Sequence, residues 1–167
     1  EHEERILLVT GIQPNMKSLV VAYGPKIGTD TPHFHKDVLF NTIFPERYPA
    51  DLSPIEIQMK NSAMKDGEAF FWDVELRQIE DICANRILGP LERGELSHVS
   101  LFALAPQPLL VKLGTILNDK YPVKVFQKHR VPDTWRWLDE DTSNDIRLIE
   151  PQDKTKEPIL VIALSSK

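Results

Sequence analysis

Residues 98–127 read HVSLFALAPQPLLVKLGTILNDKYPVKVFQ, and this stretch decides the fold. His98–Leu104 is a mostly apolar run that is typical of a buried strand, and the two prolines of residues 106–108 turn the chain. Apolar side chains recur at helical spacing over residues 109–117, and Val123–Gln127 returns to a strand pattern. Strand, helix and strand within about thirty residues form a βαβ unit. We therefore predict two adjacent parallel strands joined by a right-handed crossover.

The first third of the chain also predicts strands. Ile6–Val9, Leu19–Tyr23 and Ile55–Met59 are apolar and rich in β-branched residues. Gly24–Leu52 contains several prolines and two histidines without a sustained period, which predicts a long ordered loop or a flexible surface segment. We therefore assign residues 1–70 to a β-rich N-terminal extension.

An amphipathic helix follows this extension. Its apolar stripe consists of Trp72, Leu76, Ile79, Cys83 and Ile87. Asp73 is placed as its N-cap and Gly89-Pro90 as its stop. Further along, Ile146–Ile149 and Ile159–Leu164 predict two more strands.

Strands that alternate with helices indicate the α/β class. We expect a Rossmann-like parallel sheet flanked by helices, in one domain over residues 1–167, with residues 71–167 as the Rossmann-like core. At 167 residues and 41% apolar content, the chain can bury one substantial core but is short for two ordinary domains.

Composition narrows the function classes. The formal net charge of -5 argues against duplex binding through bulk charge, so we expect no direct DNA binding by this chain. The single cysteine, Cys83, cannot close an intramolecular disulfide, which fits a reducing cytoplasm. Apolar runs such as Pro158–Leu164 are too short to cross a bilayer, so we expect no membrane partner.

Three segments follow predicted strands of the core, where the ligands of open α/β sheets bind. They contain a helix N-terminus, cations, indole rings and hydroxyls, which together suit a ligand with phosphates and stackable bases. The candidate ligand-binding residues are Pro106, Gln107, Pro108, Gln127, Lys128, Arg130, Trp135, Trp137, Ser165, Ser166 and Lys167. The alternative interpretation is structural: Trp135 and Trp137 are core or edge residues, and Lys128 and Arg130 are a solvated pair.

Other polar groups have plainer interpretations. His33, His35 and Asp37 lack a further convincing metal ligand, so we predict no metal site there. Asp139-Glu140-Asp141 is typical of a solvated turn, and Cys83 lies on an apolar helix stripe. The chain has neither a Walker motif nor Gly-x-Gly-x-x-Gly, which argues against a nucleoside triphosphatase or a dinucleotide oxidoreductase. We expect no catalytic residue and no cofactor.

Phe102–Trp137 resembles the SAVED domain of anti-phage effectors in the CBASS systems. The residues that carry the resemblance are the Ala-Pro-Gln-Pro turn into Leu109–Gly114, then Val125–Arg130 and Trp135-Arg136-Trp137. The family is related to the CARF domains of CRISPR systems. The resemblance implies a CARF-type fold and a sensor that binds a cyclic di- or trinucleotide, self-associates, and activates a fused effector.

The resemblance also bears on what surrounds this chain. Glu1-His2-Glu3 resembles the close of the HNH nuclease domain that precedes SAVED in one effector type, which implies a DNA endonuclease in the full-length protein. SAVED domains resemble two fused CARF-like halves, and this chain corresponds to the first, so we expect the second half to be missing.

Two rival functions remain open at this point. Some CARF relatives cleave the cyclic ligand they bind, so the chain could be a ring nuclease or another nucleotide-metabolising enzyme, with His129 as the one residue placed to act as a base. A purely structural interaction domain would leave the crevice empty. A general base or metal cluster facing the ligand phosphates would favour the first rival.

Overall fold

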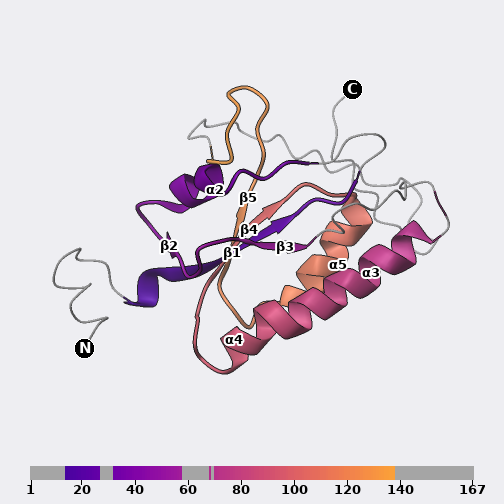
Figure 1. Ribbon diagram of the computed structural model, residues 1–167, viewed down its shortest axis with the longest axis horizontal. Helices are drawn as coiled ribbons and strands as arrows, with labels where there is room; N and C mark the ends of the chain where they lie inside the picture. Colours follow the sequence, from indigo (N-terminus) through magenta and orange to yellow (C-terminus); the bar gives the residue numbers. More distant parts are fainter. Residues whose placement is uncertain (1–13, 27–31, 58–67, 69, 138–167) are drawn as a thin grey trace, which may run out of the picture. The chain divides into compact units, whose positions relative to one another are not determined.

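Five strands and a set of helices make up the part of the chain that the computed structural model describes, residues 14–26, 32–57, 68 and 70–137 (Figure 1). The strands are β1 (Lys17–Tyr23), β2 (Tyr48–Pro49), β3 (Ile55–Ile57), β4 (Val99–Ala103) and β5 (Val123–Phe126). The helices are η1 (Pro14–Met16), α2 (Lys36–Ile43), α3 (Phe71–Ile82), η2 (Cys83–Leu88), α4 (Gly89–Glu92) and α5 (Gln107–Leu117). The predicted strands at Ile6–Val9, Ile146–Ile149 and Ile159–Leu164 lie outside the described residues.

All described strands are parallel. β1 pairs with β4 over Leu19–Tyr23, and β4 pairs with β5. On its other side, β1 pairs with β2 at its start and with β3 at its end. The chain therefore has the α/β Rossmann-like fold that the sequence predicts, and the βαβ unit of β4, α5 and β5 is confirmed.

β1 lies inside this sheet, although the sequence places it in the N-terminal extension. Its side chains are buried on both faces, and it has neighbours on both sides. The pattern of a β-rich first third is correct for β1 and β3, but their partners are strands far away in the sequence. The boundary at residue 70, between the N-terminal extension and the Rossmann-like core, stays a prediction. Strands from both sides of residue 70 lie in one sheet.

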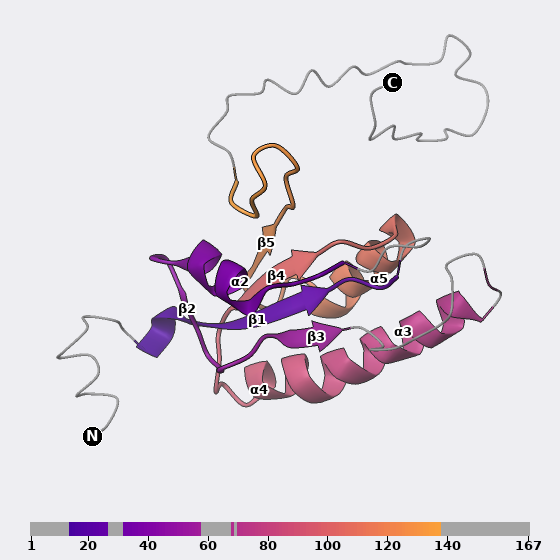
Figure 2. The same cartoon turned by 45° about the horizontal axis from the view of Figure 1, so that its top comes forward.

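Helices cover both faces of the sheet (Figures 1 and 2). Leu19, Val21 and Tyr23 of β1 pack in one core with α3 and α5. Val20 and Ala22, which point to the opposite face, pack in a second core with α2. This two-sided cover explains why residues 19–23 of β1 form a continuous apolar run and do not alternate.

Helix α3 continues through the π-helical η2 into α4, and one row of buried side chains runs along all three. Phe71, Glu75, Ile79, Cys83, Ile87 and Leu91 follow one another at intervals of four residues, and all are buried. An α-helix has 3.6 residues per turn, so a row with this spacing drifts by about 40° per step. The wider π turns of η2 offset that drift and keep Ile87 and Leu91 on the sheet.

Two predicted ends of this helix are wrong. Asp73 lies in the first turn and is not the N-cap, because the helix already begins at Phe71, whose ring packs in the core. Gly89-Pro90 does not stop the helix, because Pro90 lies in the first turn of α4, where a missing N–H costs little. The helix ends at Glu92, and Arg93 is its C-cap. The φ of 70° at the following Gly94 permits the closing hydrogen bonds from Gly94 N–H to Leu91 O and from Glu95 N–H to Pro90 O.

The long loop predicted at Gly24–Leu52 is also wrong. It contains α2 and β2. Helix α2 has only two buried residues, Leu39 and Ile43. Two apolar positions do not make a recognisable helical period, so the pattern of this proline-containing segment did not indicate a helix. Packing on the sheet stabilises this short helix where its local sequence does not.

Candidate functional site

The strand order reverses between β1 and β4. From β1 the chain passes through α2 to β3 on one side, and later returns to β4 on the other side. The loops that leave β1 and β4 therefore diverge to opposite faces at the carboxyl end of the sheet. In open α/β sheets this is the position at which ligands bind. Leu104 N–H donates to Tyr23 O at 2.9 Å and joins the two strand ends at this position.

The turn after β4 leads directly into α5. Pro106 is the N-cap, and Gln107 and Pro108 are exposed in the first turn. Pro108 has no N–H, and Leu109 and Leu110 both donate to Pro106 O. Gln107 is thus the residue of this turn that offers both a backbone N–H and a side-chain amide. A ligand phosphate would meet fewer donors here than at a helix start without proline.

The second predicted segment forms a hairpin after β5, over residues 127–137. His129 and Thr134 exchange two backbone hydrogen bonds and close it. Gln127 and Arg130 are exposed, whereas Lys128 pairs with Asp133 and lies 5.6 Å from the centre of the Trp135 ring. Arg130 is therefore an exposed cation of this segment that is open to an incoming anion, whereas the exposed Arg136 donates to Asn41 O.

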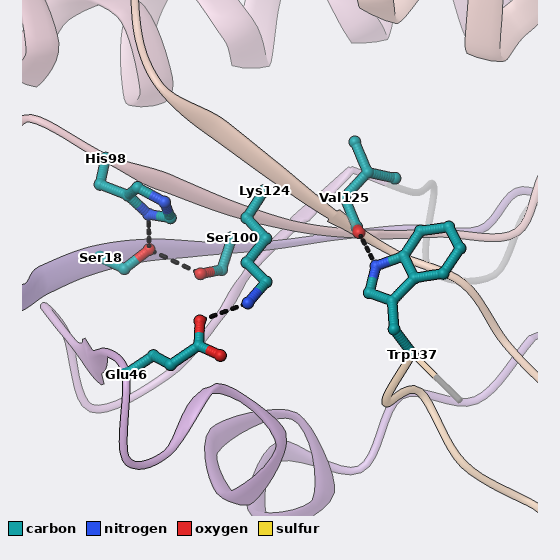
Figure 3. Close-up of polar contacts among 7 residues, drawn as sticks. All are labelled: Ser18, Glu46, His98, Ser100, Lys124, Val125 and Trp137. Carbon is teal, nitrogen blue, oxygen red and sulfur yellow. Dashed lines mark hydrogen bonds and ion pairs between the residues drawn. The ribbon is translucent and has the colours of Figure 1, made fainter. Parts of the chain in front are cut away.

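The two tryptophans of the hairpin have different environments. Trp135 is 4% exposed in the α2-side core, where Phe34 stacks on it and Phe102 meets it edge-on. Trp137 is 56% exposed, and its indole Nε1–H donates to Val125 O at 2.9 Å (Figure 3). The structural interpretation describes Trp135, and Trp137 is the ring that a base could stack on. Ligand binding by these residues stays a prediction.

The third predicted segment, Ser165-Ser166-Lys167, lies outside the described residues. At the opposite, amino end of the sheet there is a hollow of about 220 Å³. Its lining is Asn15, Lys17, Gly94, Glu95, Leu96 and Ser97. Ligand pockets measure about 300–1,000 Å³, so this hollow is small for a nucleotide.

A comparison with protein families shows to which family the chain belongs. Residues 79–167, more than half of the chain, match the model of the SAVED family, described as "SMODS-associated and fused to various effectors sensor domain". The chain belongs to the SAVED family. The match confirms the predicted SAVED domain and its role as a sensor domain. No curated protein matches the chain.

The SAVED chain also has a buried polar network, at the amino end of its sheet (Figure 3). Ser18 Oγ lies 2.8 Å from His98 Nδ1 and 2.7 Å from Ser100 Oγ. Burial, together with the nearby Arg47 and Lys124 charges, lowers the pKa of His98 to about 4. The imidazole is therefore neutral at pH 7, and the network joins β1 to β4.

An ion pair borders this network. Lys124 of β5 donates to the Glu46 carboxylate, and this hydrogen bond lowers the pKa of Glu46. The pair connects β5 to the segment after α2. Sequence analysis identified none of these residues as a group, because they come from four separate parts of the chain. Their one local signal is Ser100, a polar residue at a strand position between the apolar Val99 and Leu101.

A buried carboxyl group lies on the α3 side, under the carboxyl end of β1. Glu75 is 4% exposed, and the Tyr23 hydroxyl donates to it over a long 3.5 Å. Burial raises the pKa of Glu75, and it also raises the pKa of the Tyr23 phenol.

The residues considered for catalysis or metal binding are not grouped in the described part of the chain. His33, His35 and Asp37 are exposed, and no cluster of three or more metal-binding side chains occurs among described residues. His129 Nε2 is buried without a hydrogen-bond partner in this part. Cys83 is fully buried, and burial raises the pKa of its thiol to about 11. No described helix is long and apolar enough to span a membrane.

Proposed function

We propose that this SAVED domain senses a cyclic di- or trinucleotide at the carboxyl end of its sheet. The observation that carries the proposal is the reversal of strand order between β1 and β4, in a chain of a sensor family. In this proposal, Gln107 holds a phosphate at the start of α5, Arg130 adds a charge-assisted hydrogen bond, and Trp137 stacks on a base.

Ligand binding would then favour a self-associated state that the free protein reaches rarely, and this state would activate a fused effector. For the effector we propose a DNA endonuclease of the HNH type, in a CBASS anti-phage system. A cyclic nucleotide suits such a switch because it offers phosphates and bases in one rigid ring, so that separate loops can bind it at once.

The test is calorimetric titration of the full-length protein with a panel of cyclic di- and trinucleotides. Arg130→Ala should weaken binding by about 1.5–3 kcal/mol, roughly ten- to a hundredfold, because it removes a hydrogen bond to a charged group. It should also flatten the dependence of affinity on salt. Trp137→Ala should weaken binding without changing the salt dependence, because stacking involves no counterion.

Arg93→Ala is the matched control. Arg93 is also an exposed arginine, but it pairs with Glu95 next to the hollow at the amino end of the sheet. Its removal should leave the affinity unchanged. Equal affinity for wild type, Arg130→Ala and Trp137→Ala, all folded, would exclude the proposed site.

Incubation with the same nucleotides and a divalent metal separates a sensor from a ring nuclease. We expect intact cyclic nucleotide by chromatography, because the described residues bring no nucleophile, base and metal ligands together. Linear product that copurifies with the protein would favour the enzyme.

A further inference from the structure

Phe34 contacts the end of β1 and the hairpin after β5 at the same time. It precedes α2 by two residues and packs against the α2-side core. Its ring is stacked on Trp135, with 5.7 Å between ring centres and 26° between ring planes. Phe34 and Leu39 stand at the two positions of a hydrophobic staple, a local signal that could have located the start of α2.

The contact between Phe34 and β1 depends on a glycine. Gly24 follows the last residue of β1 and is buried. A Cβ atom at Gly24 would lie 2.6 Å from Phe34 Cε2, 2.9 Å from Phe34 Cζ and 2.9 Å from Pro32 Cβ. These distances are shorter than real Cβ contacts, so the phenyl ring and Pro32 together occupy the space that a side chain at residue 24 would need. The shortest of the three contacts is to Phe34, so a group that enters this space pushes on its ring.

The hairpin is attached to the same surroundings. Arg136 Nη2–H donates to Asn41 O in α2 at 2.9 Å, so α2 and the hairpin lie side by side (Figure 2). Trp135 is enclosed between Phe34, Phe102 and the Lys128 side chain. A buried ring in such packing moves together with its neighbours, because close-packed interiors leave little free space.

We propose that Phe34 transmits a displacement at Gly24, where the strand order reverses, to Trp135 and so to the hairpin that presents Arg130. Phe34 is a positioning residue in this device. The inference rests on the proposed function, because a ligand bound where the strand order reverses would cause the displacement at Gly24. The mechanical link itself exists with or without a ligand.

The test is a double-mutant cycle on the 167-residue chain, followed by NMR of the tryptophan indole N–H groups. Gly24→Ala pushes on the Phe34 ring and should shift the Trp135 indole signal and the backbone signals of the hairpin. In the Phe34→Leu background, the same Gly24→Ala change should produce a smaller shift, because the methyl group still meets Pro32 but no longer pushes on a phenyl ring that stacks on Trp135. Trp135→Phe assigns the indole signal.

Gly114→Ala is the matched control. Gly114 is an exposed residue of α5, and an added Cβ would meet nothing within 4 Å, so the Trp135 signal should not move. Unchanged Trp135 and hairpin signals in folded Gly24→Ala, or an equal shift in both backgrounds, would overturn the proposal. If Gly24→Ala does not fold, the single variant Phe34→Leu must shift the hairpin signals, and their constancy would overturn it. The cycle uses no nucleotide, so its failure is distinct from a failure of the proposed sensor function.

Discussion

At the amino end of the sheet, polar side chains are buried and bonded to one another, whereas at the carboxyl end they lie in loops and are mostly exposed. Ser18, His98 and Ser100 join β1 to β4 at the amino end. Gln107, Arg130 and Trp137 come from the loops and the hairpin beyond the carboxyl ends. Bonded, buried groups stabilise one arrangement, and exposed groups remain available to a ligand. The comparison assigns stability to one end and binding to the other.

The largest expected effect on stability concerns Trp135, which is buried although it lies at the carboxyl end of the sheet. Trp135→Ala should lower the free energy of unfolding by about 3–5 kcal/mol, because it removes a buried indole between Phe34 and Phe102. Trp137→Ala should lower it by only about 1 kcal/mol, since the exposed indole loses one hydrogen bond. Denaturant unfolding measures both. Equal losses would show that the two tryptophans do not differ in role.

His98 should make stability depend on pH at the amino end. Its pKa is about 4 in the folded protein and 6.5 as the ordinary value, so the unfolded chain binds a proton first. The network therefore stabilises the fold above pH 6.5, and this contribution falls as the pH drops from 6.5 to 4. We expect a loss of about 2 kcal/mol across this window, by conversion of the pKa difference with allowance for relaxation.

The control for this pH dependence is His98→Gln, which keeps a polar group but does not titrate. Its free energy of unfolding should change less between pH 6.5 and 4 than that of wild type. Arg47, Lys124 and Glu46, the charges near His98, remain in both proteins and cancel in the difference. Parallel curves for the two proteins would contradict the assignment.

The smallest effect has the opposite sign and belongs to Glu75, under the carboxyl end of β1. Because burial raises its pKa in the folded state, its contribution to stability is present below its ordinary pKa and is lost as the pH rises. Glu75→Gln should therefore stabilise the protein at pH 8 and have less effect at pH 4. Unfolding at the two pH values measures the difference. A variant less stable than wild type at pH 8 would show that the ionised carboxylate is favourable there.

The local pattern predicted the elements with long apolar periods. β4, α5 and β5 were predicted nearly to their ends, because a buried strand and an amphipathic helix each carry their own period. Helix α2 was missed because two buried residues do not make a helical period. The continuation of the helix through Pro90 was missed because its buried residues recur every four positions, and that spacing is explained only by packing on the sheet. For the site, the sequence placed Gln107, Arg130 and Trp137 beyond strand ends, but it did not separate Trp137 from Trp135.

The sequence by itself determined the α/β class, the βαβ unit and the SAVED family, since each depends on residues that are neighbours in the chain. Only the tertiary structure decided that β1 lies at the centre of the sheet, that Phe34 fills the space at Gly24, and that Ser18 bonds to His98. These contacts join residues far apart in sequence. Their partners are chosen by packing of the whole core, and no local period encodes that choice.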